Sequence, residues 1–148
     1  MYPLKYDKKS PIKSQFHKGV LFSSISDYWK TPKRFYKKLD KEFDFNFDPC
    51  PENPDFDGLL IEWKERNFIN PPYSEVEKWI EKGYRESVKG KLCVFLVASR
   101  TDTRWFHNYC LKYAKEIRFI KGRLKFNDTE NSAPFPSCII IFDGRIVN

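Results

Sequence analysis

The sequence predicts an α/β fold in a single domain, with a central, mostly parallel sheet flanked by helices. Segments with helical and strand-like patterns alternate along the chain, which is the order typical of this fold class. Residues 91–98, KLCVFLVA, are continuously apolar, as expected of a central parallel strand that is buried on both faces. The length of 148 residues fits one domain with one hydrophobic core.

The first predicted elements are a helix and an alternating strand. The helix is expected to start near Thr31, which can cap it, with Pro32 at the first helical position. Phe35 and Leu39 then share one helical face. Residues 43–48, FDFNFD, alternate phenylalanine with polar residues, which predicts a strand with one buried face.

A loop, a short strand and a long helix are expected next. Residues 49–59 are rich in proline and acid and predict the loop, and residues 67–70 predict the strand. The helix covers residues 74–87 and begins with a capping box, Ser74-x-x-Glu77. Its apolar stripe consists of Val76, Trp79, Ile80 and Tyr84. Its solvent face is expected to hold the i,i+4 ion pairs Glu81–Arg85 and Lys82–Glu86.

The elements after the central apolar strand are shorter. Residues 103–114 predict a helix with its aromatic residues on one side. Residues 116–120 and 123–126 predict two short strands of a hairpin, in which Leu124 and Phe126 pack inward. The last elements are a polar loop at 127–136 and a buried strand at 137–142.

Composition excludes several classes of protein. Hydrophobic residues make up 41% and aromatic residues 18% of the chain, so it is globular and not intrinsically disordered. No run of 18 apolar residues exists, so no membrane span is expected. The N-terminal segment lacks the apolar core of a signal peptide, which predicts a cytoplasmic protein.

The cysteines and histidines give no indication of a metal site. No CxxC pair occurs, and Cys93 and Cys138 lie inside apolar strand-like runs, where we expect buried thiols and neither disulfides nor zinc ligands. His17 and His107 have no metal-ligand spacing to any other residue.

The net charge of +7 is concentrated at one end of the chain. Residues 1–40 carry ten Lys/Arg and three Asp/Glu, whereas residues 41–148 carry 17 of each. We predict a basic, loosely structured arm at 1–24, followed by the domain at 25–148. A local basic stripe suits a polyanion such as nucleic acid. The alternative is a solvated tail that keeps the protein soluble.

Two predicted strands end in polar side chains, Asp48 and Asn70. Because ligands of open α/β sheets bind beyond the carboxyl ends of the strands, we expect both side chains to face one crevice. Asp48 is suited to accept hydrogen bonds from the amino group of S-adenosylmethionine, or it is an ordinary turn aspartate. The nearby Trp29 and Thr31-Pro32 either line the methionine end of that cofactor or serve as a core ring and a helix cap.

The tetrapeptide Asn70-Pro71-Pro72-Tyr73 suits recognition of an amino group on a flat ring. The Asn70 side-chain carbonyl and the Pro71 main-chain carbonyl can accept both N–H bonds, which directs the nitrogen lone pair toward an electrophile. The prolines fix the backbone, so little reorganises during reaction. Tyr73 offers a face for stacking of a base outside the duplex. Alternatively, the prolines only end a strand and Tyr73 fills the core.

Together these segments resemble the phage-type Dam family of DNA N6-adenine methyltransferases, over about residues 20–142. The segments that carry the resemblance are LFSSISDYWKTP, FDFNFDPCPENPDFDGL, NFINPPYS, SRTDTRWFH, IRFIKGRLKF and SAPFPS. The resemblance implies a shortened, Rossmann-like methyltransferase fold that uses S-adenosylmethionine to methylate the N6 amino group of a flipped-out adenine in DNA.

The resemblance also implies roles for particular residues. The tetrapeptide 70–73 holds the adenine, while Asp48, Pro49 and Cys50 correspond to the first cofactor motif, with Trp29 and Thr31-Pro32 beside it. A second acidic residue normally contacts the cofactor ribose, and the sequence does not choose among the candidates. These candidates are Glu52, Asp55, Asp57 and Glu62.

The sequence departs from the family pattern after Asp48, where no glycine follows and the stretch to Asn70 is too short for two further βα units. This departure favours one alternative, a non-catalytic DNA-binding descendant of the fold. A further alternative is a methyltransferase that acts on RNA or on a protein glutamine. The sequence indicates neither the DNA recognition sequence nor the oligomeric state.

Candidate DNA contacts are basic residues outside the tetrapeptide, together with the arm and the loop at 127–136. Arg100 follows the central strand and is suited to meet a phosphate, or it pairs with a local carboxylate. The other candidates are Lys33, Arg34, Lys37, Lys38, Lys121 and Arg123.

Overall fold

The computed structural model describes residues 29–146. The predicted basic arm and the predicted start of the domain at residue 25 lie outside this range. The elements are α2 (Lys33–Phe43), β1 (Arg66–Ile69), η1 (Tyr73–Glu75), α3 (Val76–Val88), β2 (Leu92–Ala98), η2 (Phe106–Cys110), α4 (Leu111–Tyr113), β3 (Glu116–Phe119), η3 (Phe126–Asp128) and β4 (Ser137–Asp143).

The α/β class is confirmed, but the prediction of a mostly parallel sheet is wrong. The strand order is β1-β2-β4-β3, in which β1 pairs with β2 in parallel and β4 is antiparallel to both of its neighbours. The reason lies in the connection between β3 and β4. The intervening chain leaves and re-enters the sheet at the same end, so that Phe119 pairs with Cys138 and the last strand runs in reverse.

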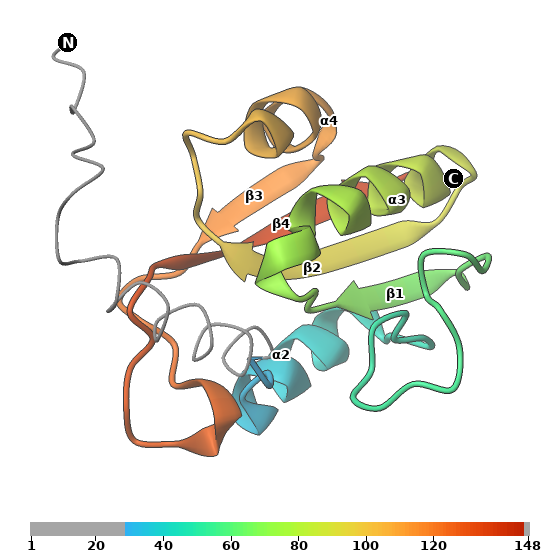
Figure 1. Cartoon of the computed structure of the whole chain (residues 1–148). Coiled ribbons are helices and arrows are strands. Elements are labelled where there is room, and N and C mark those ends of the chain that lie inside the picture. Colours follow the sequence, from blue (N-terminus) through green and yellow to red (C-terminus); the bar gives the residue numbers. More distant parts are fainter. Residues whose placement is uncertain (1–28, 147–148) are drawn as a thin grey trace, which may run out of the picture.

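Helices cover both faces of the sheet (Figure 1). α3 and α4 lie over one face, and α2 lies under the other. β2 is fully buried, as predicted, because its alternate side chains contribute to both layers. Phe95 belongs to the cluster under α3, while Val94 belongs to the cluster against α2. The shared face of Phe35 and Leu39 is also confirmed, since both pack in the second cluster.

The predicted strand at 43–48 is wrong apart from one residue. α2 continues through Phe43 and ends because Asp44 adopts the left-handed conformation, with φ of 52°. Only Phe47 pairs with the sheet, through a parallel bridge to Asn67. The alternation correctly separates the half-buried phenylalanines from their exposed polar neighbours. The prediction that they share one face is wrong, because Phe43 and Phe45 pack in the cluster against α2 and Phe47 packs in the cluster under α3.

Residues 49–65 contain neither helix nor strand. This loop folds back on its own beginning at Gly58, where a Cβ atom would lie 1.9 Å from the Pro49 carbonyl oxygen. The Trp63 indole donates a hydrogen bond of 2.7 Å to the Gly58 carbonyl. A glycine is therefore required for this close approach, which fixes the turn directly after Asp48.

The start of α2 differs from the prediction that Thr31 caps it. Pro32 was predicted at the first helical position, but it occupies the N-cap position, and the helix begins at Lys33. Proline has no side-chain acceptor, so it makes no cap hydrogen bond. The cap comes from a distant segment, because Asp128 Oδ1 accepts a hydrogen bond of 3.2 Å from the Lys33 amide. A remote carboxylate thus satisfies a free amide at the positive end of the helix dipole.

The start of α3 also differs from the predicted capping box. A 3₁₀ turn precedes the helix, which begins at Val76, so the N-cap residue is Glu75 and not Ser74. The apolar stripe is confirmed, with Trp79 and Ile80 buried against the sheet.

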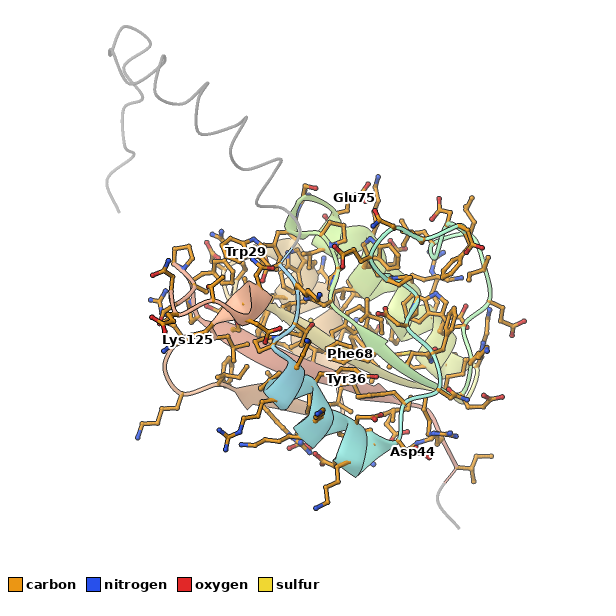
Figure 2. All side chains as sticks on the ribbon, turned by 90° about the horizontal axis from the view of Figure 1, so that it is seen from below. Trp29, Tyr36, Asp44, Phe68, Glu75 and Lys125 are labelled. Atoms are coloured by element: carbon orange, nitrogen blue, oxygen red, sulfur yellow. The ribbon has the colours of Figure 1, made fainter. Side chains whose placement is uncertain are left out.

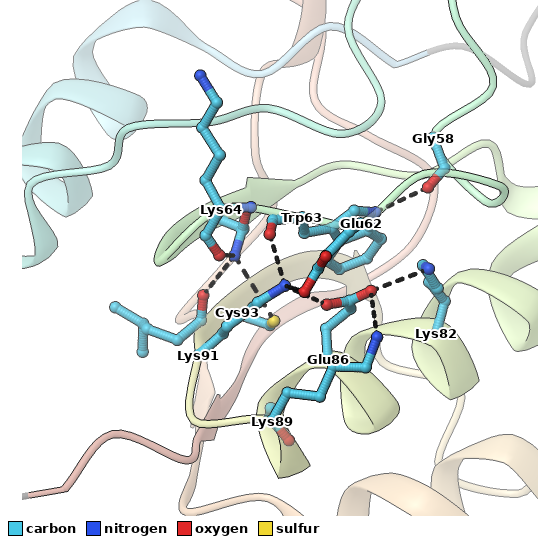
Figure 3. Close-up of polar contacts among 12 residues, drawn as sticks. Gly58, Glu62, Trp63, Lys64, Lys82, Glu86, Lys89, Lys91 and Cys93 are labelled. Carbon is cyan, nitrogen blue, oxygen red and sulfur yellow. Dashed lines mark hydrogen bonds and ion pairs between the residues drawn. The ribbon is translucent and has the colours of Figure 1, made fainter.

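Glu86 was expected on the solvent face of α3 but is fully buried. Its carboxylate lies 2.9 Å from Lys82 Nζ, 2.6 Å from Lys91 Nζ and 3.5 Å from Lys89 Nζ (Figure 3). The i,i+4 pair with Lys82 is therefore confirmed, but lysines from beyond the helix enclose it. The other predicted pair, Glu81–Arg85, is confirmed at 2.6 Å and is partly exposed.

The segment after β2 is helical at 104–113, close to the prediction, with a π-helical stretch at its centre. The predicted strand at 123–126 is wrong, because this segment pairs with no strand and leads into η3. Leu124 and Phe126 do pack inward as predicted. Burial of Phe126 beside Trp29 draws the chain away from the sheet edge.

Cys93 and Cys138 are buried free thiols, as predicted. None of the helices formed by residues 29–146 combines the length and the apolar character that a membrane span requires.

Candidate active site

The two polar strand ends meet at one cavity, as expected. Asp48 follows the bridge at Phe47, and Asn70 follows β1, and both line a cavity of about 300 Å³. This volume lies at the lower end of the range of small-molecule sites in proteins.

The Asn70 side chain has a fixed orientation. Its amide nitrogen donates one hydrogen bond to the Trp29 main-chain carbonyl and another, of 3.0 Å, to Thr31 Oγ1. A carbonyl oxygen can only accept, so the nitrogen end of the amide must face Trp29. The oxygen Oδ1 makes no hydrogen bond to any residue in the described range. It remains available as an acceptor at the cavity.

Asp48 closes its own turn and also lines the cavity. Its Oδ1 accepts a hydrogen bond of 2.9 Å from the Cys50 amide, so the turn expected of an Asp-Pro sequence is present. The side chain keeps solvent contact, but the surrounding walls displace much of its water. This burial raises the pKa of Asp48 to about 6, against the lowering effect of the Cys50 amide. Burial likewise raises the pKa of the Cys50 thiol to about 12, so it is protonated at neutral pH.

The first cavity is lined by acidic residues from one segment of the chain and by lysines from another. Of the four acidic candidates in the following loop, Glu52 lines the cavity together with Asp48. Among the others, Asp57 accepts from the Leu59 amide and Glu62 pairs with Lys91. The basic lining residues come from α2 and the segment before it. They are Lys30, Lys33 and Lys37.

The tetrapeptide also borders a second cavity, of about 280 Å³. Tyr73 and Phe135 line it, with ring centroids 5.0 Å apart and ring planes at 88°. Arg100 and Trp105 lie on its wall. Asn70 thus contributes to the first cavity and Tyr73 to the second. The sequence predicts no role for Phe135, although this residue lies in SAPFPS, one of the segments that carry the family resemblance.

An aromatic cluster supports the second cavity from behind. The Trp29 ring lies 6.3 Å from Tyr73, 5.6 Å from Phe126 and 5.3 Å from Phe135, between centroids. Trp29 is therefore half-buried among rings, as expected of a core ring, while its carbonyl holds Asn70. The structure brings together some of the predicted cofactor residues and not others: Thr31, Asp48 and Cys50 line the first cavity, whereas Trp29, Pro32 and Pro49 do not.

The candidate DNA contacts are exposed and have no carboxylate partners among residues 29–146. Lys33 and Lys37 line the first cavity and Arg100 the second, while Lys121 lies in the turn after β3. Figure 2 looks onto α2, several of whose outward side chains end in nitrogen atoms. Within residues 29–146, no ion pair forms at any of the seven positions. The seven are Lys33, Arg34, Lys37, Lys38, Arg100, Lys121 and Arg123.

Comparison with known proteins identifies the family. The family model described as DNA N-6-adenine-methyltransferase (Dam) matches residues 18–142. The chain belongs to the Dam family. The resemblance predicted over residues 20–142 is thereby confirmed, and the activity of the Dam family in general is N6 methylation of adenine in DNA. A search of curated proteins gives no match.

Proposed function

We propose that the chain transfers a methyl group from S-adenosylmethionine to the N6 amino group of a flipped-out adenine in DNA, on a shortened Rossmann-like fold. One observation carries this proposal. Both N–H groups of the Asn70 amide are engaged within the protein, so an oriented acceptor is left at a cavity that Asp48 also lines. We further propose that it acts in the cytoplasm, which is that of a bacterial host if a phage encodes the protein.

The Asn70 amide and the Pro71 carbonyl supply the chemistry of the attacking group. The adenine amino nitrogen is a poor nucleophile, because its lone pair is delocalised into the ring. Acceptance of its two hydrogens by Asn70 Oδ1 and the Pro71 oxygen localises the lone pair on nitrogen. When bound, the cofactor supplies an electrophilic methyl carbon, whose bond to sulfur breaks as the bond to nitrogen forms. The N6 proton then leaves to solvent, and the preset acceptors need little reorganisation.

The first cavity fits the cofactor by its charge. The methionine end of S-adenosylmethionine carries an ammonium group and a carboxylate. Asp48 provides an acceptor for the ammonium, and Lys33 or Lys37 complements the carboxylate. We propose Glu52 for the ribose hydroxyls, because it alone of the four acidic candidates lines this cavity.

The second cavity fits the target base. Tyr73 and Phe135 present two rings at nearly right angles, so that a purine can stack on one and meet the edge of the other. Stacking of a base on an aromatic ring contributes about 1–3 kcal/mol. The base must leave the duplex to reach this site, because its amino group is otherwise paired within the stack.

The DNA backbone is proposed to contact the cations that pair with no carboxylate of the described residues. Arg34 and Lys38 extend from α2, and Lys121 and Arg123 lie in the segment that follows β3. Arg100 stands beside the proposed base cavity, where a phosphate next to the flipped nucleotide would lie.

A second candidate function is DNA binding without catalysis. One observation favours it: residues 49–65 contain no helix or strand that would build a larger cofactor site. Binding of S-adenosylhomocysteine by calorimetry separates the two. Heat of binding supports the enzyme, whereas its absence at millimolar ligand supports the non-catalytic alternative.

Transfer of labelled methyl groups from S-adenosylmethionine onto plasmid DNA, RNA and a protein-only sample tests the proposed activity. Wild type is expected to label DNA alone, at adenine N6. Asn70→Ala is expected to lower the rate by about 1000-fold, as when a preset hydrogen-bonding group is removed from an active site. Asn46→Ala is the matched control, because this exposed asparagine bonds Glu65 away from both cavities. Labelling of RNA or protein by wild type would contradict the proposal.

A further inference from the structure

We infer that Thr31 is a positioning residue whose hydroxyl fixes the Asn70 amide with its oxygen toward the cavity. This inference rests on the proposed function of Asn70. Thr31 Oγ1 accepts a hydrogen bond of 3.0 Å from Asn70 Nδ2, across 39 residues of sequence. The Trp29 carbonyl accepts from the same nitrogen.

Orientation matters because the two ends of an amide have nearly the same shape and opposite hydrogen-bonding character. With Oδ1 toward the cavity, Asn70 accepts from an amino group. If the amide turns over, its own NH₂ faces that amino group and the site loses its acceptor. A turned amide would also bring Oδ1 against the Trp29 carbonyl oxygen, which disfavours it. Thr31 adds a second acceptor on the side where the nitrogen must lie.

The segment that carries Thr31 is held in place from the far side. The Lys30 amide donates to Asn127 Oδ1 at 2.8 Å, and the Asn127 amide donates to the Lys30 carbonyl at 2.9 Å. Asp128 caps α2 through the Lys33 amide at 3.2 Å. Both Asn127 and Asp128 adopt left-handed backbone conformations, with φ of 60° and 52°. Asn127 and Asp128 thus bind the chain on either side of Thr31, through Lys30 and Lys33, and this fixes the position of the Thr31 hydroxyl.

The other roles open to Thr31 make different predictions. It is not the cap of α2, because Pro32 occupies the N-cap position and the Lys33 amide donates to Asp128 Oδ1. As a direct cofactor ligand it would govern cofactor affinity. As a positioning residue it governs the rate of methyl transfer from the bound state, because the amide orientation matters when the target amino group is held.

The test compares Thr31→Val, which removes the acceptor, with Thr31→Ser, which keeps it. Thr31→Val is expected to lower kcat about tenfold, the effect of one hydrogen bond, and to change the Kd of S-adenosylhomocysteine by less than twofold. Thr31→Ser is expected to restore most of the lost rate. Thr129→Val is the matched control, since its hydroxyl bonds the Phe126 carbonyl and does not touch Asn70. Thermal melting verifies that each variant is folded.

A second measurement follows the amide itself, without activity. The Asn70 NH₂ gives a pair of proton–nitrogen NMR signals, identified by their loss in Asn70→Ala. Thr31→Val is expected to shift these signals and speed their hydrogen exchange, whereas Thr31→Ser leaves them near the wild-type positions.

The outcomes separate this inference from the proposed function. An unchanged kcat in Thr31→Val overturns the inference, and so does a rise in Kd with kcat unaffected. Unmoved Asn70 NH₂ signals in Thr31→Val overturn it as well. If wild type fails to methylate DNA, the proposed function fails, and the NMR signals still decide whether Thr31 orients Asn70.

Discussion

The two ends of the sheet hold carboxylates in opposite circumstances. At the amino end of β2, Glu86 is fully buried and three lysines approach it within 3.5 Å. Burial alone would raise the pKa of Glu86, but hydrogen bonds from Lys91 and Lys82 hold it below its usual value. At the other end, Asp48 keeps solvent contact, forms no ion pair with the described residues, and has a pKa raised to about 6.

The difference teaches which charges serve the fold and which are available to ligands. Cations near the Glu86 end are neutralised by carboxylates of the protein. Arg118 of β3 is neutralised in the same way, because its guanidinium lies 2.6 Å from the Glu42 carboxylate of α2. Cations near the cavities have no such partners in the described part of the chain, so their fields extend into solvent. The molecule therefore separates a closed, self-neutralised end from an open end that is ready for charged ligands.

The largest expected effect is loss of the buried carboxylate. Glu86→Ala should lower the free energy of unfolding by about 3 kcal/mol, because it leaves Lys82 and Lys91 without their common partner. Urea unfolding measures this change. The Kd of S-adenosylhomocysteine should stay the same, since Glu86 lines neither cavity.

Glu81→Ala is the matched control, because it breaks an exposed i,i+4 pair on the same helix and should cost less than about 0.5 kcal/mol. Equal losses in the two variants would contradict the distinction between the closed end and the solvent-exposed surface.

A smaller loss is expected where α3 approaches β2. Gly83→Ala places a Cβ atom 2.3 Å from the Phe95 ring, so the core must shift. Overpacking should cost about 2 kcal/mol, although alanine is the better helix former. Thermal melting checks the sign, and a stabilised variant would show that the two layers can separate at this point.

At the open end the expected change in stability has the opposite sign. Asp48→Asn keeps an acceptor for the Cys50 amide and removes the desolvated charge, so it should stabilise the protein by about 1 kcal/mol at pH 8, after allowance for solvent screening. Because the folded pKa is about 6 and the ordinary value is 3.8, wild type regains this stability as pH falls through 6. Melting curves of the two proteins should therefore converge below about pH 4. A constant difference across this range would show that Asp48 is not the titrating group.

The same variant sharpens the functional side of the comparison. Asp48→Asn should bind S-adenosylhomocysteine about tenfold more weakly at pH 8, because the ionised acceptor for the ammonium is lost. Wild type should lose affinity as pH falls below about 6, with protonation of Asp48. Calorimetry at pH 5 and pH 8 measures both. Tighter binding at pH 5 would remove Asp48 from the cofactor site.

The smallest expected effect on stability comes from the cations of α2 that form no ion pair within residues 29–146. Arg34→Ser and Lys38→Ser should leave the melting temperature nearly unchanged, and each should reduce the slope of log affinity for DNA against log salt by about 1. Lys78→Ser is the control, since Lys78 is exposed but pairs with Glu75 at 3.7 Å. An equal loss of slope in all three would indicate a general effect of net charge and not a defined DNA surface.

Local pattern was sufficient to predict the core of the candidate site. The apolar run predicts β2, because a strand buried on both faces needs apolar side chains throughout. Polar residues mark where the neighbouring segments end, and the geometry of strand ends then brings Asp48 and Asn70 to one cavity. The alternation at 43–48 predicted that the phenylalanines are more buried than their polar neighbours, but not that they divide between the two core clusters. It failed to predict that a left-handed Asp44 and a single bridge replace the strand, because pairing depends on a partner elsewhere in the chain.

Contacts between distant segments account for what the sequence did not reveal. Glu86 has helical spacing to Lys82, which indicates a solvent-exposed pair, but Lys91 reaches it from the start of the next strand. Phe135 reaches Tyr73 from a polar loop, and Thr31 reaches Asn70 across 39 residues. None of these contacts leaves a periodic trace in the sequence, because each is fixed only once the layers have packed.

The position of β4 has a consequence for how the molecule is made. β4 is the last strand of the described chain, yet it occupies an interior place in the sheet, between β2 and β3. On the ribosome, β2 and β3 therefore cannot be joined until residues 137–143 have emerged. During that interval β2 and β3 each have an unpaired edge that can pair with other nascent chains. Rapid pairing of this final segment with both edges therefore protects the nascent protein against aggregation.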